Sequence, residues 1–191
     1  KSLSGLYNIF KGSSEFHTEF YIYDSVGKYN ILDEFFTPED LKISDHWFKG
    51  AFDENGFFTG EVRVFNQIFQ HTFKPIRPPG KTPYGSFNIE LSFNEGTLKN
   101  SKLSAEQWDY IGKKTENFGG LYIYRDGFRV LPYGRTDYDF LGFEERRSKG
   151  AGYYFFSHRN MYGYIDISRE KNRSLTDKAG REGFIANKAY R

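Results

Sequence analysis

The loop Ser174–Phe184, close to the C-terminal end of the chain, carries the residue types best suited to chemistry. Within it, Lys178 and Arg181 are separated by two small residues, Ala179-Gly180. Small residues let the backbone approach a ligand closely, and the planar donor fork of arginine suits phosphate oxygens. Glu182 could hold that fork in place. We therefore expect this loop to recognise an anion, although a charged loop without further context is usually solvated surface.

Other catalytic chemistries lack the residue patterns that they require. The chain has no cysteine, which excludes disulfides, thiolate metal sites and cysteine nucleophiles. Glu144 and Glu145 are adjacent, so on a helix they diverge by about 100° and cannot face one substrate together. Lys149–Gly152 lacks the spacing of a phosphate-binding loop. None of the four histidines has a partner at metal-ligand spacing or a Ser/His/Asp context: His17, His46, His71 and His158. No metal site is predicted.

Composition favours a β-rich or α+β fold. The 191 residues include 21 Phe and 15 Tyr, which suit the half-buried faces of antiparallel sheets. The net charge of +2 is small, but residues 144–191 hold 11 Lys and Arg against 6 Asp and Glu. The C-terminal part is therefore locally basic.

The sequence shows no targeting segment. No apolar run approaches the roughly 20 residues needed to span a bilayer, and no signal peptide is visible. We expect a cytoplasmic protein without a membrane partner. The chain begins at Lys1 rather than Met, which fits a piece of a longer protein.

The first half of the chain predicts strands. Glu15–Asp24 is aromatic-rich, and a short helix is expected to begin at Thr37. His46–Phe52 and Phe57–Phe65 flank an Asn-Gly turn and predict a hairpin, which Gln67–Lys74 continues. Pro75–Gly85 holds four of the six prolines and predicts a boundary. We expect residues 1–80 to form a β-rich N-terminal subdomain of unknown role.

The second half predicts the order β–α–β–β–α–β. The expected elements, in sequence, are a strand Phe87–Phe93, a helix from the Ser104–Gln107 capping box to about Thr115, a hairpin Leu121–Leu131 turning at Asp126-Gly127, a helix within Asp137–Arg147, a strand Met161–Ser168 and a helix beginning at Ile185. The last helix starts but has no visible end, which again fits a truncated domain.

Four motifs of this half resemble the second, or transducer, domain of the GHKL superfamily of ATPases. That superfamily unites gyrase B, the heat-shock chaperone of ninety kilodaltons, histidine kinases and MutL, and the likeness is greatest to bacterial chaperone-like ATP-binding proteins of poorly defined role. The matching stretches are the hairpin Gly119–Val130, the helix Leu141–Arg147, the strand Gly163–Ile167 and the loop Asp177–Gly183. The resemblance covers residues 86–191 and implies a transducer-like domain with a left-handed βαβ-type sheet and its helices on one face.

The resemblance also implies a function. Arg181, helped by Lys178, would reach the γ-phosphate of ATP held by an N-terminal ATP-binding domain of the same parent chain. The supporting residues would be Asp177, Gly180, Glu182 and Gly183. ATP and Mg²⁺ would belong to the parent protein, an ATPase, and neither is expected to bind this stretch alone, which would be inactive. A homodimer of the parent, a client protein and DNA are the further partners that the superfamily implies.

A nucleic-acid-binding module remains the alternative from the residues themselves. Aromatic residues are interleaved with basic ones between residues 146 and 159, and such a surface can bind phosphates and stack bases. The basic residues are Arg146, Arg147, Lys149 and Arg159. The aromatic residues are equally suited to packing within a sheet.

Overall fold

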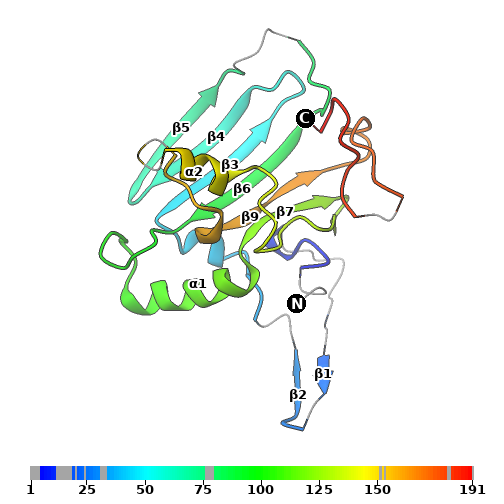
Figure 1. Cartoon of the computed structure of the whole chain (residues 1–191). Coiled ribbons are helices and arrows are strands. Elements are labelled where there is room, and N and C mark those ends of the chain that lie inside the picture. Colours follow the sequence, from blue (N-terminus) through cyan, green and yellow to red (C-terminus); the bar gives the residue numbers. More distant parts are fainter. Residues whose placement is uncertain are drawn as a thin grey trace.

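A seven-stranded sheet forms the body of the molecule (Figure 1). The computed structural model describes residues 5–11, 19, 21–23, 25–30, 34–75, 80–150, 152, 154–179 and 182–190. The helices are η1 (Ile9–Lys11), η2 (Asp40–Lys42), α1 (Ala105–Phe118), α2 (Phe143–Lys149) and η3 (His158–Asn160), where η marks a 3-10 turn. The strands are β1 (Tyr21–Tyr23), β2 (Lys28–Asn30), β3 (His46–Phe52), β4 (Phe58–Val64), β5 (Gln67–Phe73), β6 (Phe87–Phe93), β7 (Gly120–Arg125), β8 (Phe128–Arg129) and β9 (Met161–Ile167).

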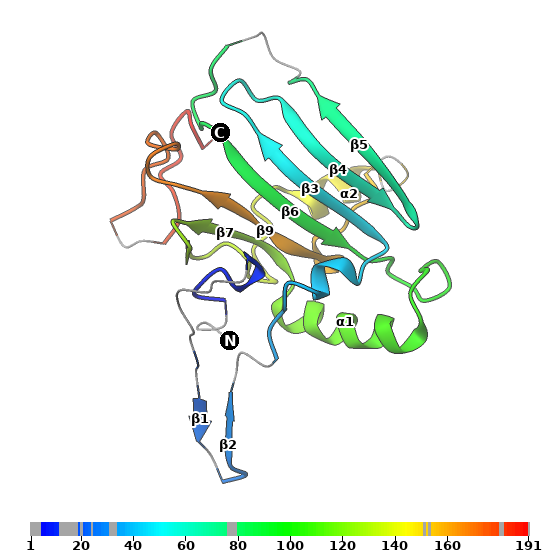
Figure 2. The same cartoon turned by 180° about the vertical axis from the view of Figure 1, so that it is seen from behind.

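The strands of the main sheet lie in the order β5-β4-β3-β6-β9-β7-β8. β7 and β9 run parallel, and the other neighbours are antiparallel. β1 and β2 form a separate hairpin that projects from the body (Figures 1 and 2). None of the described helices is long and apolar enough to cross a membrane. The prediction of an α+β fold is confirmed.

Elements with strong local signals form where the sequence predicts them. The second half follows the order β6-α1-β7-β8-α2-β9, which confirms β–α–β–β–α–β. The capping box is present, because Ser104 Oγ accepts from Gln107 N while Gln107 Oε1 accepts from Ser104 N, both at 3.1 Å. The turn between β7 and β8 has Asp126 and Gly127 at positive φ, as a tight hairpin requires. The β3–β4 hairpin is likewise confirmed.

Three predicted helices differ from the structure. The helix expected within Asp137–Arg147 begins only at Phe143, because Gly142 has φ +67° and interrupts any earlier turn. The helix expected at Thr37 is a single 3-10 turn, η2. No helix begins at Ile185 within the described residues up to Tyr190; Ile185 N instead donates to Thr176 O, and turns follow.

The proline-rich segment Pro75–Gly85 does not separate two sheets. Strand β3 lies before it and β6 lies after it, yet the two pair over all seven residues, from His46↔Phe93 to Phe52↔Phe87. The expected division into residues 1–80 and 86–191 therefore cuts through one continuous sheet. The physical reason is that the backbone N–H and C=O groups of β6 need hydrogen-bond partners on both sides of the strand. β3 supplies the partners on one side.

One face of the sheet is covered by the main aromatic core. Tyr122 and Tyr124 of β7 lie beside Tyr162 and Tyr164 of β9, and we call this surface the tyrosine face. Buried residues from four segments cover it: Phe10, Phe35, Phe36, Leu41, Ile111 and Phe118. Figure 2 shows η2 and the N-terminal segments in front of the sheet on this side. Aromatic ring packing rather than aliphatic packing therefore builds the core.

The tyrosine face also buries polar residues of β6. Phe87, Ile89, Leu91 and Phe93 share the opposite face, as predicted, but Glu90 and Ser92 are more buried than most of them. Glu90 is satisfied because it accepts hydrogen bonds from Trp47 Nε1 (3.2 Å) and Tyr164 OH (3.1 Å). Partnered carboxylates can be buried at low cost, which alternation of apolar residues cannot reveal.

The helices do not share one face of the sheet, contrary to the expectation from the resemblance. α1 packs onto the tyrosine face through Ile111 and Phe118. The segment that follows α2 packs Phe155 and Phe156 against Phe93, which register places on the opposite face. Figure 1 shows α2 in front of β3 and β4, and Figure 2 shows it behind them. α2 buries none of its residues, so no apolar stripe ties it to the tyrosine face.

Candidate functional site

The predicted anion-binding loop is held as a short hairpin. Lys178 N donates to Gly183 O at 2.9 Å, and Ile185 N donates to Thr176 O at 2.8 Å. An antiparallel bridge joins Asp177 to Phe184. Gly180 and Arg181 lie outside the described residues. Gly183 has φ +92°, a conformation that favours glycine, and this gives the predicted glycine a backbone role.

Arg125, the last residue of β7, clamps both arms of this hairpin. Its Nη1 donates to Asp177 Oδ1 at 2.7 Å, and its Nη2 donates to Leu175 O at 2.6 Å. Its guanidinium carbon also lies 4.7 Å from the ring centroid of Phe184. Arg125 is only 8% exposed, so these contacts are shielded from solvent. Asp177 was predicted to support the site. In the structure it holds its arm of the hairpin to β7 by pairing with Arg125.

A second set of contacts anchors the other side of the loop. Glu182 forms a parallel bridge with Leu131, and its side chain is exposed. Phe184 N donates to the hydroxyl of buried Tyr133 at 3.3 Å. Burial raises the pKa of Tyr133, so its hydroxyl stays neutral and can act as that acceptor. The loop is therefore fixed to the body of the domain on both arms.

The loop borders a groove of about 830 Å³. Lys178 and Glu182 line it together with two arginines, Arg129 and Arg135. Arg129 lies with its guanidinium carbon 4.5 Å from the ring centroid of Tyr122 and donates from Nε to Tyr133 O at 3.0 Å. Arg129 and Arg135 lie on one segment and Lys178 lies on another that is distant in sequence, and together they give the groove cationic walls.

Two carboxylates, those of Glu182 and Asp137, moderate the charge of the groove. Arg135 holds Asp137 in a two-point contact, with Nε and Nη2 at 2.9 and 2.6 Å from the two carboxylate oxygens. This hydrogen bonding lowers the pKa of Asp137 below its usual value. Both side chains are exposed, so the pair contributes little stability. The exposed pair can open without a large cost when an anion competes for Arg135.

The residues of the nucleic-acid alternative lie on α2 and η3. Arg146, Arg147, Lys149 and Arg159 are all exposed. Lys149 pairs with Glu145 at 2.5 Å, and Arg146 donates to Leu141 O at 2.8 Å. Exposed aromatic side chains lie nearby in the chain, at Tyr154, Phe155 and Phe156. The basic and aromatic groups are thus both accessible, on segments that are close together in the chain.

Glu144 links α2 to η3. Partial burial alone would raise the pKa of Glu144, but the hydrogen bond from Ser157 Oγ and the bond from Arg159 N, with the charges of Arg159 and Arg147, lower it. Glu144 is therefore an ionised structural acceptor that orients the η3 segment. An ionised carboxylate has no proton to donate, so Glu144 cannot act as a general acid.

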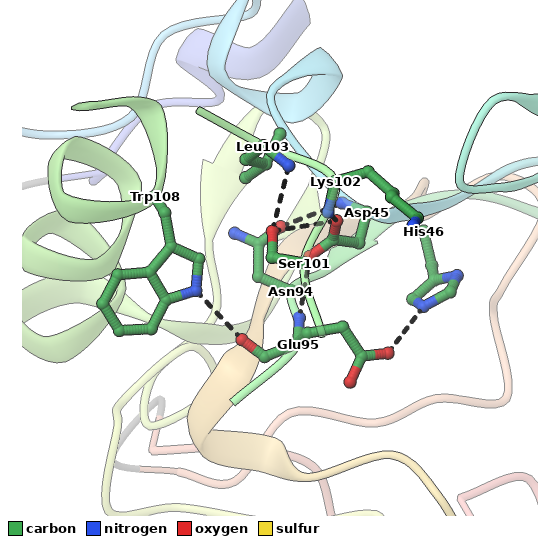
Figure 3. Close-up of polar contacts among 8 residues, drawn as sticks. All are labelled: Asp45, His46, Asn94, Glu95, Ser101, Lys102, Leu103 and Trp108. Atoms are coloured by element: carbon green, nitrogen blue, oxygen red, sulfur yellow. Dashed lines mark hydrogen bonds and ion pairs between the residues drawn. The ribbon is translucent and has the colours of Figure 1, made fainter. Parts of the chain in front are cut away.

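A buried polar network that the sequence did not predict lies where β3, β6 and the loop before α1 meet (Figure 3). Asp45 Oδ1 accepts from Ser101 Oγ (3.0 Å) and Lys102 N (2.7 Å), while its Oδ2 accepts from Glu95 N (3.0 Å). His46 Nε2 lies 3.1 Å from Glu95 Oε1. Figure 3 shows these side chains converging from three chain segments. Both oxygens of Asp45 are satisfied within the protein, which indicates a structural role.

A cavity of about 590 Å³ adjoins this network and is lined in part by Glu95, Trp108 and His158. His158 is buried, with Nε2 3.3 Å from Arg135 O and Nδ1 3.7 Å from Asp139 Oδ1. Both ring nitrogens thus face protein acceptors. Among the described residues, no group of three or more His, Cys, Asp or Glu side chains could hold a metal ion.

In comparisons with known proteins, no protein-family model, curated protein or solved structure matches the chain.

Proposed function

We propose that the chain is the second, transducer-like domain of a two-part ATPase of the GHKL type. In this proposal the hairpin loop 177–184 is presented to a nucleotide held by a preceding domain of the parent protein. Arg181 is the γ-phosphate-sensing residue and Lys178 assists it. The parallel pair β7 and β9, joined through β8 and α2, would correspond to the left-handed βαβ-type unit of such domains.

The clamp of Arg125 on both arms of the loop is the observation that carries the proposal. A γ-phosphate contact made across two domains needs a loop whose arms are held by the domain that bears it. Arg125 holds the arms through Asp177, Leu175 and Phe184. Lys178 and Glu182, one on each arm, line the groove together with Arg129 and Arg135.

ATP and Mg²⁺ are assigned to the preceding domain. The groove residues fit phosphate oxygens through their guanidinium and ammonium donors, whereas Mg²⁺ requires several oxygen ligands. When bound, the metal would neutralise charge on the phosphate chain. The residues of this chain would orient and stabilise the terminal phosphate, and loss of that phosphate on hydrolysis would release the loop. The domain angle would then depend on the nucleotide.

The test uses the parent protein that includes the preceding domain. Arg181→Ala is expected to lower ATPase turnover on the order of 10³-fold or more, the usual contribution of such an arginine. Lys178→Ala should lower it less, and nucleotide affinity should change little in both. Arg173→Ala is the control, since Arg173 is an exposed basic residue close to the same loop. Unchanged turnover in Arg181→Ala would exclude the proposed role.

A nucleic-acid-binding surface is the second candidate. It is favoured by the exposure of Arg146, Arg147 and Arg159 and of Phe155 and Phe156, which lie close to them in the chain. Single-stranded DNA should bind with an affinity that falls steeply with salt, and replacing the three arginines with alanine should reduce that salt dependence. Lys99→Ala, at an exposed lysine elsewhere, serves as control. Absence of salt-dependent binding would remove this candidate.

A further inference from the structure

The strand β5 is an unprotected sheet edge. It is the outermost strand of the described sheet, and all seven of its residues are exposed. Gln67–Phe73 contains no charged residue and no proline, and it pairs with β4 one-to-one without a bulge. Natural edge strands are normally shielded by lysines, prolines, bulges or very short length. A seven-residue edge with none of these devices is suited to pairing with another strand.

The register identifies which backbone groups of β5 are open. Phe65 N donates to Asp45 O at 2.7 Å, so this residue directs its backbone toward β3. Alternate residues of a strand direct their backbone groups to opposite sides, so Val64 and every second residue before it face β5. Their partners on β5 are its odd-numbered residues. The N–H and C=O groups of Ile68, Gln70 and Thr72 therefore point away from the sheet.

These open groups match those of a second β5 strand in antiparallel orientation. Pairing about Gln70 sets Gln70 opposite its own copy and Ile68 opposite Thr72. All three are the residues with outward backbone groups, so three N–H and three C=O groups on each strand find partners. If the register shifted by one residue, the outward backbone groups of one strand would lie opposite residues whose backbone groups already point toward β4. Those residues could not serve as hydrogen-bond partners. The strand is self-complementary at the level of its backbone.

The side chains permit the same pairing. On one face Phe69 would lie opposite His71 of the copy, and such aromatic cross-strand pairs are favourable. Phe73 extends this surface, and Phe69 and Phe73 are 42% and 47% exposed. On the other face Ile68, 61% exposed, would lie opposite Thr72. No charge opposes another, and apolar surface is removed from water on both faces.

We propose that two copies of this chain associate through β5, antiparallel and centred on Gln70, so that their sheets join across a two-fold axis. The interface is isologous and closes at two copies. The opposite edge of the sheet does not compete, because Leu6 O accepts from Arg129 N and Asn8 N donates to Gly127 O alongside β8. This association is independent of any nucleotide or of the role of Arg181.

Single cysteines test the register directly, because the chain has none of its own. In the proposed pairing, Gln70→Cys places two Cα atoms about 5.5 Å apart, within the range that a disulfide spans. Thr72→Cys lies on the same strand and face, but its two copies would be roughly 13 Å apart. Under mild oxidation Gln70→Cys should give a disulfide-linked dimer and Thr72→Cys should not. Equal cross-linking of both variants would overturn the register.

Oligomeric state tests the association itself. The 191-residue chain should show a concentration-dependent monomer–dimer equilibrium in sedimentation velocity. Gln70→Pro removes only an outward N–H, and Gln70→Lys opposes two like charges, so both should be monomeric with unchanged circular dichroism. Leu98→Lys adds the same charge at an exposed site away from β5 and should still dimerise. A wild-type chain that remains monomeric, or a Gln70→Pro variant that still dimerises, would overturn the proposal.

Discussion

Arg125 and Asp177 form an ion pair that locks the end of β7 to the first arm of the candidate loop, with Nη1 2.7 Å from Oδ1. The two residues are 52 positions apart in sequence. Arg125 is 8% exposed and Asp177 is 32% exposed, so the arginine is the buried partner. The same guanidinium binds Leu175 O and covers Phe184. One side chain thus contacts both arms of the loop.

Arg125→Met should release the loop without unfolding the domain. Methionine fills a similar volume with apolar atoms, and Asp177, which loses its partner, is 32% exposed, so water can solvate its carboxylate. Trypsin cleaves after Lys and Arg, so cleavage after Lys178 and Arg181 should become faster while circular dichroism stays unchanged. Arg169→Met, at an exposed arginine on the neighbouring turn, should leave the cleavage rate unchanged. A wild-type cleavage rate in Arg125→Met would contradict the clamp.

Local signals predicted much of the fold. The Asn55-Gly56 and Asp126-Gly127 turns and the Ser104 capping box identified two hairpins and α1, because each depends on residues within a few positions. Pairing of β3 with β6 joins residues about forty positions apart, and no local pattern encodes it. The prolines between them indicated a boundary, although the strands on either side of it belong to one sheet.

The candidate site could be predicted only in part for the same reason. Lys178 and Glu182 were identified from their types and spacing, and the structure brings them to one groove. Arg129 and Arg135 complete that groove but carry no local signal, because hairpin arginines are common surface residues. The clamp by Arg125 and the burial of Glu90 likewise depend on partners that only the folded sheet supplies.

Asp45→Ala should destabilise the domain strongly. Asp45 is 1% exposed and accepts three hydrogen bonds, so its loss leaves a buried donor on Glu95 and partly buried donors on Ser101 and Lys102 unpaired. We expect a loss of about 3 kcal/mol or more in the free energy of unfolding, measured by urea denaturation.

Asp53→Ala is the matched control for this change. Asp53 accepts from Asn55 N and Phe57 N at 2.8 and 2.9 Å, but it is exposed in the β3–β4 turn. Water can replace those bonds, so the loss should be about 1 kcal/mol. Equal losses in the two variants would show that burial of the Asp45 network does not contribute.

The two tyrosines of β7 should respond differently to loss of their hydroxyl. Tyr122 OH donates to Phe118 O at 2.7 Å, whereas Tyr124 OH is buried with no hydrogen-bond partner among the described residues. Tyr122→Phe should therefore cost about 1 kcal/mol, while Tyr124→Phe should be neutral or stabilising, because it removes an unsatisfied buried group. Thermal unfolding of the two variants provides the comparison. A Tyr124→Phe variant less stable than Tyr122→Phe would contradict this assignment.

The tyrosine face should make the domain sensitive to alkali. Burial raises the pKa of Tyr122, Tyr124, Tyr162 and Tyr164 well above the ordinary value near 10. These groups keep their protons in the folded state, whereas the unfolded chain releases them once the pH exceeds about 10. Stability is thus fully present below pH 10 and falls above it, by about 1.4 kcal/mol per pH unit for each tyrosine.

Urea denaturation at increasing pH measures this fall, because the free energy of unfolding should decrease steadily above pH 10. Tyr124→Phe removes one titrating group and should reduce the slope of stability against pH by about 1.4 kcal/mol per pH unit, since each tyrosine contributes one proton. Phe58→Leu changes a buried aromatic residue that does not titrate, so it should lower stability without changing the slope. If the four tyrosines ionised in the native protein near pH 10, the tyrosine face would have to be open to water.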